Sequence, residues 1–184
     1  MEDNFKEVSY SATTVSELMI PAYANFGGKI HGGIILSLMD KVAYACASKH
    51  ASNYCVTVSV ENVDFIEPIE VGEMVTLYAS VNYVGTSSMV VRIKVIAENF
   101  LVGTVKHTNT SYFTMVAKDA KGKPTKVPGL ILETKEDIKR FLEAIKRKEL
   151  RTTYKKAMQD VRISLLVEPE NKMLENERCM LKLV

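Results

Sequence analysis

The segment from Asn25 to Asp40 contains residue types that could stabilise a developing oxyanion and move a proton. Its glycine pair, Gly32-Gly33, stands directly before an apolar run that favours a helix, and glycines let a substrate approach the backbone closely. A helix N-terminus offers unpaired N–H groups and the positive end of the helix dipole to such an oxyanion. Asp40 lies within the apolar run, where a carboxylate is costly unless it has a partner or a function.

The spacing within this segment argues against one simple site on one helix. Gly32 and Asp40 are eight residues apart, which would span about 12 Å along a helix axis. One carbonyl group cannot lie within about 3 Å of a backbone donor at Gly32 and also contact a water held by Asp40. Either the two residues serve different steps, or the carboxylate comes from a second subunit.

The same residues also have ordinary structural interpretations. Asp40 alone could be a helix acid paired with Lys41, Lys29 or a partner subunit. Asn25 alone would more often be a turn residue. His31 precedes the helix, a position that favours packing or N-terminal capping over a role as a base. The combination of these residues in one segment, rather than any one of them, favours catalysis.

Other nucleophiles and metal ligands find little support in the sequence. The three histidines lack metal-site spacing of the His-Glu-x-x-His kind, so we predict no metal. Ser37 lacks the Gly-x-Ser-x-Gly setting, which argues against an α/β-hydrolase. Cys46 and Cys55 are expected to be small core residues.

The elements that would position the segment are one buried helix and about four long strands. From Gly33 to about Lys49, apolar residues recur at helical spacing and extend almost all round, which predicts a helix covered by its neighbours. Such a helix can be enclosed by a strongly twisted sheet. Alternation with a period of two predicts a first strand within 5–16 and further strands over 56–65, 75–83, 89–97 and 104–117.

Two regions need separate treatment. The alternation over 56–65 slips by one residue near Glu61-Asn62, which predicts a β-bulge there. After Pro128-Gly129 the pattern changes, and residues 133–149 have a helical pattern with acids at the start and bases near the end. Within 150–184, the apolar residues could form a second helix or a strand.

The composition is that of an ordinary soluble globular protein with one domain and an appended tail, since 47% of the 184 residues are hydrophobic and 25% are charged. A net charge of +2, without RNP-like or zinc-finger patterns, argues against nucleic acid. Three cysteines without a CxxC pair fit a reducing compartment. The start of the chain does not have the pattern of a signal peptide, and the longest apolar run, 33–47, is too short to span a bilayer. We therefore expect a cytoplasmic protein with no membrane partner.

The pattern from roughly Pro21 to Leu130 resembles the hotdog-fold acyl-CoA thioesterases. The similarity is most specific over 25–40 and continues at 56–72, 83–89, 112–114 and 122–128. The branch it resembles most is that of the broad-chain-length acyl-CoA hydrolases, both bacterial and of the tandem-domain animal cytosolic type. The resemblance implies an α+β fold in which an antiparallel sheet wraps a central helix. It implies a hotdog domain over 1–130 and an added C-terminal helical segment over 131–184.

The resemblance also implies a reaction, the hydrolysis of acyl-CoA thioesters without a separate cofactor. It places the chemistry on Asn25 and Asp40, with Asp40 as general base or nucleophile and Asn25 orienting water or the carbonyl. The backbone N–H of Gly32, together with that of Gly33, would hold the carbonyl oxygen. The family forms hotdog dimers, which implies a site shared across a homodimer interface and suggests a hexamer built as a trimer of dimers.

For the CoA part of the substrate, the resemblance points to two places on the sheet. The pantetheine arm would lie along the strand edge near Val58, Ser59 and Val60. The nucleotide end would lie near the turn formed by Gly85, Thr86, Ser87 and Ser88. Phosphates require cations or N–H donors, and the candidate cations are Arg92, Lys29, Lys94, Lys121 and Lys123.

Two other functions fit the same fold. A non-catalytic hotdog module could bind or sense acyl-CoA, but such regulators carry a DNA-binding segment, and about twenty residues before the loop are too few for a helix-turn-helix. A hydratase or dehydratase would use an Asp/His pair at a different place, and the sequence contains no matching pair. Thioester hydrolysis is therefore the function we expect.

Overall fold

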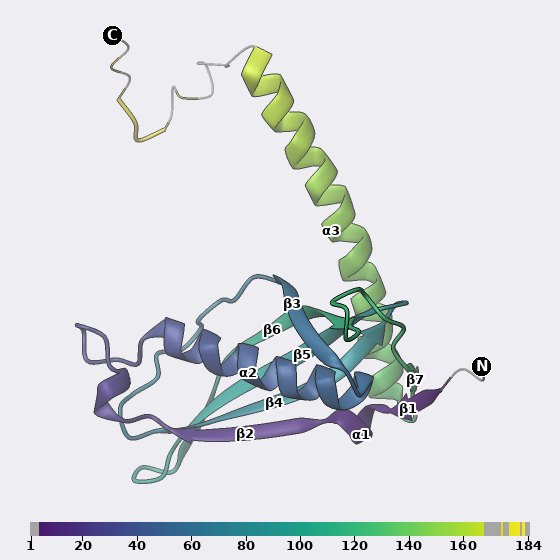
Figure 1. The fold of residues 1–184 in the computed structure, drawn as a ribbon. Coiled ribbons are helices and arrows are strands. Elements are labelled where there is room, and N and C mark those ends of the chain that lie inside the picture. The colour runs from purple at the N-terminus through teal and green to yellow at the C-terminus, as the bar shows by residue number, and fades with distance from the viewer. Residues whose placement is uncertain (1–3, 168–173, 175–176, 181, 183–184) are drawn as a thin grey trace. The chain divides into compact units, whose positions relative to one another are not determined.

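A computed structural model describes residues 4–167, 174, 177–180 and 182. A long helix, α2 (Gly32–Ala51), lies along one face of a five-stranded antiparallel sheet (Figure 1). The order across this sheet is β2-β4-β5-β6-β3, which makes β2 and β3 its edge strands. The strands are β2 (Thr13–Leu18), β3 (Tyr54–Val60), β4 (Met74–Val84), β5 (Ser88–Asn99) and β6 (Thr104–Lys118).

The predicted central helix is confirmed, and its two ends have clear local causes. At the N-terminus the side chain of His31 caps the helix, because its Nδ1 accepts a hydrogen bond of 2.9 Å from the Gly33 N–H. At the C-terminus Ser52 adopts the left-handed conformation with φ 54°, and its N–H donates to the Ser48 carbonyl at 2.8 Å. The capping role expected for His31 is thereby confirmed.

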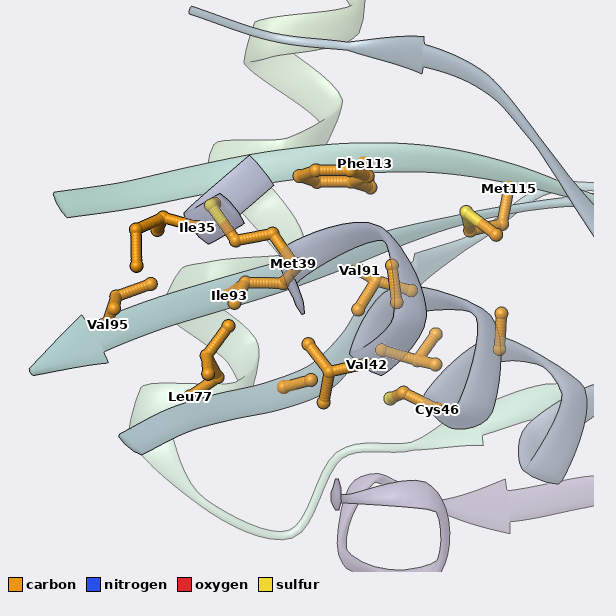
Figure 2. Close-up of a cluster of buried hydrophobic side chains, with 14 of the residues drawn as sticks. Ile35, Met39, Val42, Cys46, Leu77, Val91, Ile93, Val95, Phe113 and Met115 are labelled. Carbon is orange, nitrogen blue, oxygen red and sulfur yellow. The ribbon is translucent and has the colours of Figure 1, made fainter. Parts of the chain in front are cut away.

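One side of α2 packs on the sheet and forms the core. Side chains of the helix point toward inward-facing residues of β4, β5 and β6 (Figure 2). The labelled members are Ile35, Met39, Val42, Cys46, Leu77, Val91, Ile93, Val95, Phe113 and Met115. The sequence predicted a helix covered by neighbours on nearly every side, but its opposite side is exposed in the single chain. The exposed residues there are Leu36, Ser37, Asp40 and Tyr44. A single sheet covers only one side of a helix, which explains the difference.

The long strands expected over 75–83, 89–97 and 104–117 are confirmed as β4, β5 and β6. The strand expected over 56–65 is shorter than predicted, because β3 ends at Val60 and the segment that follows is irregular. The β-bulge predicted near Glu61-Asn62 is wrong in position. The shift in register with β6 instead lies between Thr57 and Ser59, so Val58 is the extra residue.

The N-terminal strand expected within 5–16 is interrupted. Its first part, β1 (Phe5–Glu7), pairs in parallel with β7 (Gly129–Ile131), and a one-turn helix, α1 (Val8–Ser11), separates it from β2. The interruption buries Ser11 against the end of α2, where Ser11 Oγ lies 3.4 Å from Nδ1 of the buried His50. A short 3₁₀ helix, η1 (Pro21–Tyr23), precedes the loop that leads into α2.

The charged C-terminal segment forms one helix, α3 (Lys135–Val167), which extends well beyond the predicted 133–149. Residues 150–167, for which the sequence left a helix or a strand open, are therefore helical. Most of the segment after Val167 lies outside the described residues. The chain divides into two compact units, Met1–Ala144 and Ile145–Val184, so the first turns of α3 belong with the sheet unit. No helix among the described residues combines the length and hydropathy needed to cross a bilayer.

Candidate active site

Asp40 lies on the exposed side of α2 and is held by a residue of the neighbouring strand. The Thr57 hydroxyl donates a hydrogen bond of 2.6 Å to Asp40 Oδ1. A bond this short between a hydroxyl and a carboxylate is charge-assisted and fixes the orientation of the acid. The same hydroxyl lies 3.3 Å from Met115 Sδ, which anchors it against the core. Among the described residues Asp40 has neither of the lysine partners that its sequence context had suggested.

A surface pocket of about 370 Å³ opens beside this pair. One wall comes from α2 and the other from the edge strand β3. Its lining residues are Asp40, Lys41, Tyr44, Tyr54, Cys55, Val56 and Thr57. A carboxylate at the rim of an otherwise largely apolar pocket is the arrangement expected of a site for an apolar group with a reactive polar end.

The N-terminus of α2 is built tightly around its two glycines. A Cβ on Gly32 would lie 3.2 Å from the Phe65 ring, so the ring approaches the backbone as only glycine comfortably allows. The Gly33 N–H already donates to His31, which leaves the Gly32 N–H as the better placed donor for an oxyanion. The predicted contribution of Gly33 therefore requires its N–H to be shared with, or released by, the His31 ring.

Asn25 organises the loop that precedes the helix. Its Oδ1 accepts hydrogen bonds from the N–H groups of Gly27 at 2.8 Å and Lys29 at 3.2 Å. The Asn25 N–H donates to the Lys29 carbonyl at 2.7 Å, which closes the loop. The interpretation of Asn25 as a turn residue is therefore confirmed. Because Oδ1 is engaged, only the amide Nδ2 is left for contact with a water or a carbonyl.

The structure does not bring all the predicted catalytic residues of one chain together. Gly32 and Asp40 both lie in α2, so the separation of about 12 Å along the axis applies. Within residues 4–167, no hydrogen bond joins Asn25 or Gly32 to Asp40. Within one chain the predicted catalytic residues therefore lie in two places, one at the N-terminus of α2 and one in the middle of the helix.

The residues predicted to bind CoA lie in three different settings. Val58 and Val60 are exposed on the edge strand β3, and Ser59 pairs with Thr114 of β6. The turn Gly85–Ser88 joins β4 to β5 at the end of the sheet that carries Thr57, because Met89 and Thr57 both pair with Met115. Arg92 lies on the other face of the sheet from α2, since its neighbours along β5 point into the core.

Other candidate nucleophiles and ligands behave as structural residues. Burial raises the pKa of the Cys46 thiol to about 12 and also raises that of Cys55, so neither is primed for attack. Both are buried, which confirms that they are core residues. His50 is also buried, and His107 Nε2 lies 2.8 Å from Thr110 Oγ1. The described residues contain no cluster of His, Cys, Asp and Glu that could hold a metal ion.

Comparison with known proteins decides the family. The model for the thioesterase superfamily matches residues 27–116. Protein VdlD of Helicobacter pylori is 46% identical over 138 residues, which cover 75% of this chain and 79% of VdlD. A crystal structure of an apo-hexameric acyl-CoA thioesterase superposes with a TM-score of 0.80 at 36% identity, covering 82% of this chain and 97% of that one. The chain belongs to the thioesterase superfamily.

Membership of this superfamily confirms the predicted resemblance and the α+β hotdog fold. The acyl-CoA hydrolase of Staphylococcus aureus, solved with butyryl-CoA, CoA and CoA disulfide, is 30% identical with a TM-score of 0.78, covering 88% of this chain and 99% of that one. Solved variants of that hydrolase replace one asparagine, one aspartate and one threonine with alanine. The three positions have the same order and spacing along that chain as Asn25, Asp40 and Thr57 have here.

Thr57 was not predicted as a residue of the candidate site. In the sequence it stands between two valines, at a polar position of the alternation that predicts a strand over 56–65. A threonine at a polar position of a strand gives no signal of its partner, which lies 17 residues earlier in the chain. Tyr44 and Tyr54 were not predicted for the same reason, since the pocket that they line exists only where α2 and β3 meet.

Proposed function

We propose that this protein hydrolyses acyl-CoA thioesters to a carboxylic acid and CoA. The observation that carries the proposal is the exposed Asp40 carboxylate, fixed by Thr57 at the rim of a largely apolar pocket. A thioester carbonyl placed beside this carboxylate would meet either a water activated by it or the carboxylate itself. The acyl-CoA hydrolases among the chain's structural neighbours support the same reaction.

The complete site would be shared by two chains. One chain would supply Asp40, oriented by Thr57, and the partner subunit would supply the Gly32 N–H as oxyanion donor. The Gly32 of the same chain as Asp40 lies about 12 Å away along the helix axis, too far to serve the same carbonyl. The Asn25 amide would come from the same partner as Gly32, because both belong to the loop and cap of one α2. Exposed apolar residues on α2 and on the edge strand β3 are suited to such an interface.

In the reaction, charge builds on the thioester oxygen as the carbonyl carbon becomes tetrahedral. The Gly32 N–H at the positive end of the helix dipole would stabilise that charge. The hydroxyl of Thr57 keeps the Asp40 carboxylate oriented as the proton moves from water, or as the carboxylate attacks. In the general-base version the CoA thiolate then leaves and takes a proton from the acid formed on Asp40. In the nucleophilic version the thiolate leaves and is protonated by solvent, and water then hydrolyses the anhydride to release the carboxylic acid and restore the Asp40 carboxylate.

The test is release of free thiol from a panel of acyl-CoA substrates by the wild type and by Asp40→Asn. The wild type should release thiol, and Asp40→Asn should lose at least a hundredfold in kcat because the group that activates or forms the nucleophile is gone. Asp160→Asn, an exposed aspartate of α3, is the matched control and should keep full activity. CoA binding without thiol release by the wild type would favour the non-catalytic module instead.

The base and nucleophile versions of the mechanism differ in where oxygen from solvent enters. In a single turnover in ¹⁸O-labelled water, a general base delivers the label directly to the released acid. A nucleophilic Asp40 forms an anhydride with the acyl group, and water attacking the enzyme carbonyl would place the label in the Asp40 carboxylate first. Label in the peptide that contains Asp40, detected by mass spectrometry, would therefore overturn the general-base version.

A further inference from the structure

The pocket beside Asp40 has a direction, which two pairs of residues define. At one end Thr57 of β3 is hydrogen-bonded to Asp40 of α2. At the other end the ring of Tyr54, at the start of β3, lies 6.0 Å from the ring of Tyr44, one helical turn beyond Asp40. All four residues line the same pocket. From the carboxylate toward the C-terminal part of α2, the pocket is thus lined by two tilted aromatic rings.

The chemistry of an acyl-CoA decides which part of it fits this space. The thioester must lie at Asp40, and two groups leave it in different directions. The CoA arm ends in phosphates, which require solvent, cations or N–H donors. The acyl chain is apolar, and Val56, the buried Cys55 and the two tyrosine rings offer apolar contacts. The acyl chain is therefore the part that the pocket accepts.

The positions of the tyrosines also set a length. Four residues of helix from Asp40 to Tyr44 advance about 6 Å, and three residues of strand from Thr57 to Tyr54 advance about 10 Å. An extended alkyl chain with C–C bonds of about 1.5 Å advances about 1.25 Å per carbon. Chains of roughly five to eight carbons would therefore reach the tyrosine rings.

We propose that Tyr44 and Tyr54 close the acyl end of the site and set the upper limit of acyl chain length. This inference rests on the proposed hydrolysis of acyl-CoA. Removing either ring opens the end of the pocket, so longer chains gain apolar contact there without a change at the thioester. The two tyrosines act on specificity and take no part in bond cleavage.

The test measures kcat/KM for straight-chain acyl-CoA substrates from acetyl to palmitoyl in the full-length protein. In the wild type kcat/KM should fall at least tenfold beyond about eight carbons, since a misfit of one or two methylenes costs that much. In Tyr44→Ala and Tyr54→Ala this fall in kcat/KM should occur at longer chains. The kcat/KM for lauroyl-CoA should rise about tenfold, while the kcat/KM for butyryl-CoA should stay within about threefold of wild type. Tyr44→Phe and Tyr54→Phe keep the rings and should keep the wild-type limit.

Tyr78→Ala is the matched control, because Tyr78 is exposed to the same extent as Tyr44, at 44%, but lies on the face of β4 away from α2. Its chain-length profile should equal that of the wild type. Tyr44→Trp provides a second variant that does not create a cavity. Its larger ring should shorten the longest acyl chain that the enzyme hydrolyses efficiently. Thermal unfolding of each variant verifies that it folds.

The outcomes separate this inference from the proposed function. A wild type that releases no thiol from any chain length overturns both. In a second outcome the wild type hydrolyses acyl-CoA while the alanine and tryptophan variants keep the same upper chain length as Tyr78→Ala. That result overturns only the assignment of Tyr44 and Tyr54. A limit that moves to longer chains with alanine and to shorter chains with tryptophan supports it.

Discussion

The hydroxyl of Thr57 donates a hydrogen bond of 2.6 Å to the carboxylate of Asp40 and so joins the edge strand β3 to the exposed side of α2. This contact orients the one acid of the central helix without neutralising it, because a hydroxyl brings no formal charge. It also places the acid at the rim of a pocket whose two walls are those same elements. The local geometry of the acid is therefore set by the packing of helix on strand.

The contact predicts different effects for two substitutions of Thr57. Thr57→Val keeps the shape of the side chain but removes the donor, and a hydrogen bond to a charged group is worth about 1.5–3 kcal/mol, so kcat/KM should fall roughly 10–100-fold. Thr57→Ser keeps the donor and should stay within about fivefold of wild type. Steady-state kinetics with a thiol reagent measures both. Equal activities in the valine and serine variants would contradict the role given to the hydroxyl.

The proposed sharing of the site between two chains predicts that two inactive variants complement one another. When Asp40→Asn and Asn25→Ala chains are unfolded and refolded together, mixed dimers should hold one intact site. Activity should return to about a quarter of wild type, because random pairing makes half of the dimers mixed and only one of their two sites is intact. Co-refolding Asp40→Asn with Asp40→Ala is the control and should restore nothing. No gain over the separate variants would show that one chain builds the whole site.

The cap at the start of α2 predicts that His31 acts on stability rather than on proton transfer. His31→Ala removes the acceptor for the Gly33 N–H and should lower the free energy of unfolding by about 1 kcal/mol. His31→Asn supplies another good capping side chain and should restore most of that loss while keeping thioester hydrolysis. Urea unfolding and the thiol assay report the two effects. An asparagine variant as inactive as Asp40→Asn would mean that the imidazole takes part in the chemistry.

The buried His50 predicts a pH-dependent part of the stability. Burial lowers its pKa below the usual 6.5, and the nearby Lys6 ammonium lowers it further against the opposing effect of the Pro128 carbonyl. Because the folded pKa is depressed, the unfolded chain binds the proton first as pH falls. This contribution to stability is fully present above pH 6.5 and is lost as the pH falls from there toward the folded pKa, at up to about 1.4 kcal/mol per pH unit.

His50→Gln tests this by removing the titration while keeping an amide donor for the Pro128 carbonyl, which accepts from Nε2 at 3.1 Å in the wild type. Urea unfolding of both proteins between pH 7 and pH 5 gives the free energy of unfolding at each pH. The fall in this free energy should be smaller in the glutamine variant. Parallel curves for the two proteins would show that other groups account for the whole dependence.

Much of the fold could be predicted from local patterns. The helix from Gly32 and the strands β4, β5 and β6 have the apolar periods of 3.6 and 2 that physical chemistry imposes on half-buried elements. The errors occur where tertiary contacts override such a pattern. The first strand breaks because Ser11 turns toward His50, and the bulge in β3 lies at Val58, where the register with β6 decides its place.

For the site, the sequence alone determined that Asn25, the glycine pair and Asp40 belong to one segment, and that Gly32 and Asp40 are too far apart in one helix to serve one carbonyl. Helical rise is a local property, so residue spacing was enough for that conclusion. Only the tertiary structure decided that Thr57 orients Asp40 and that Tyr44 and Tyr54 line the pocket. Those contacts join residues of α2 to residues of β3, and the packing of side chains between two elements follows from no periodicity within either of them.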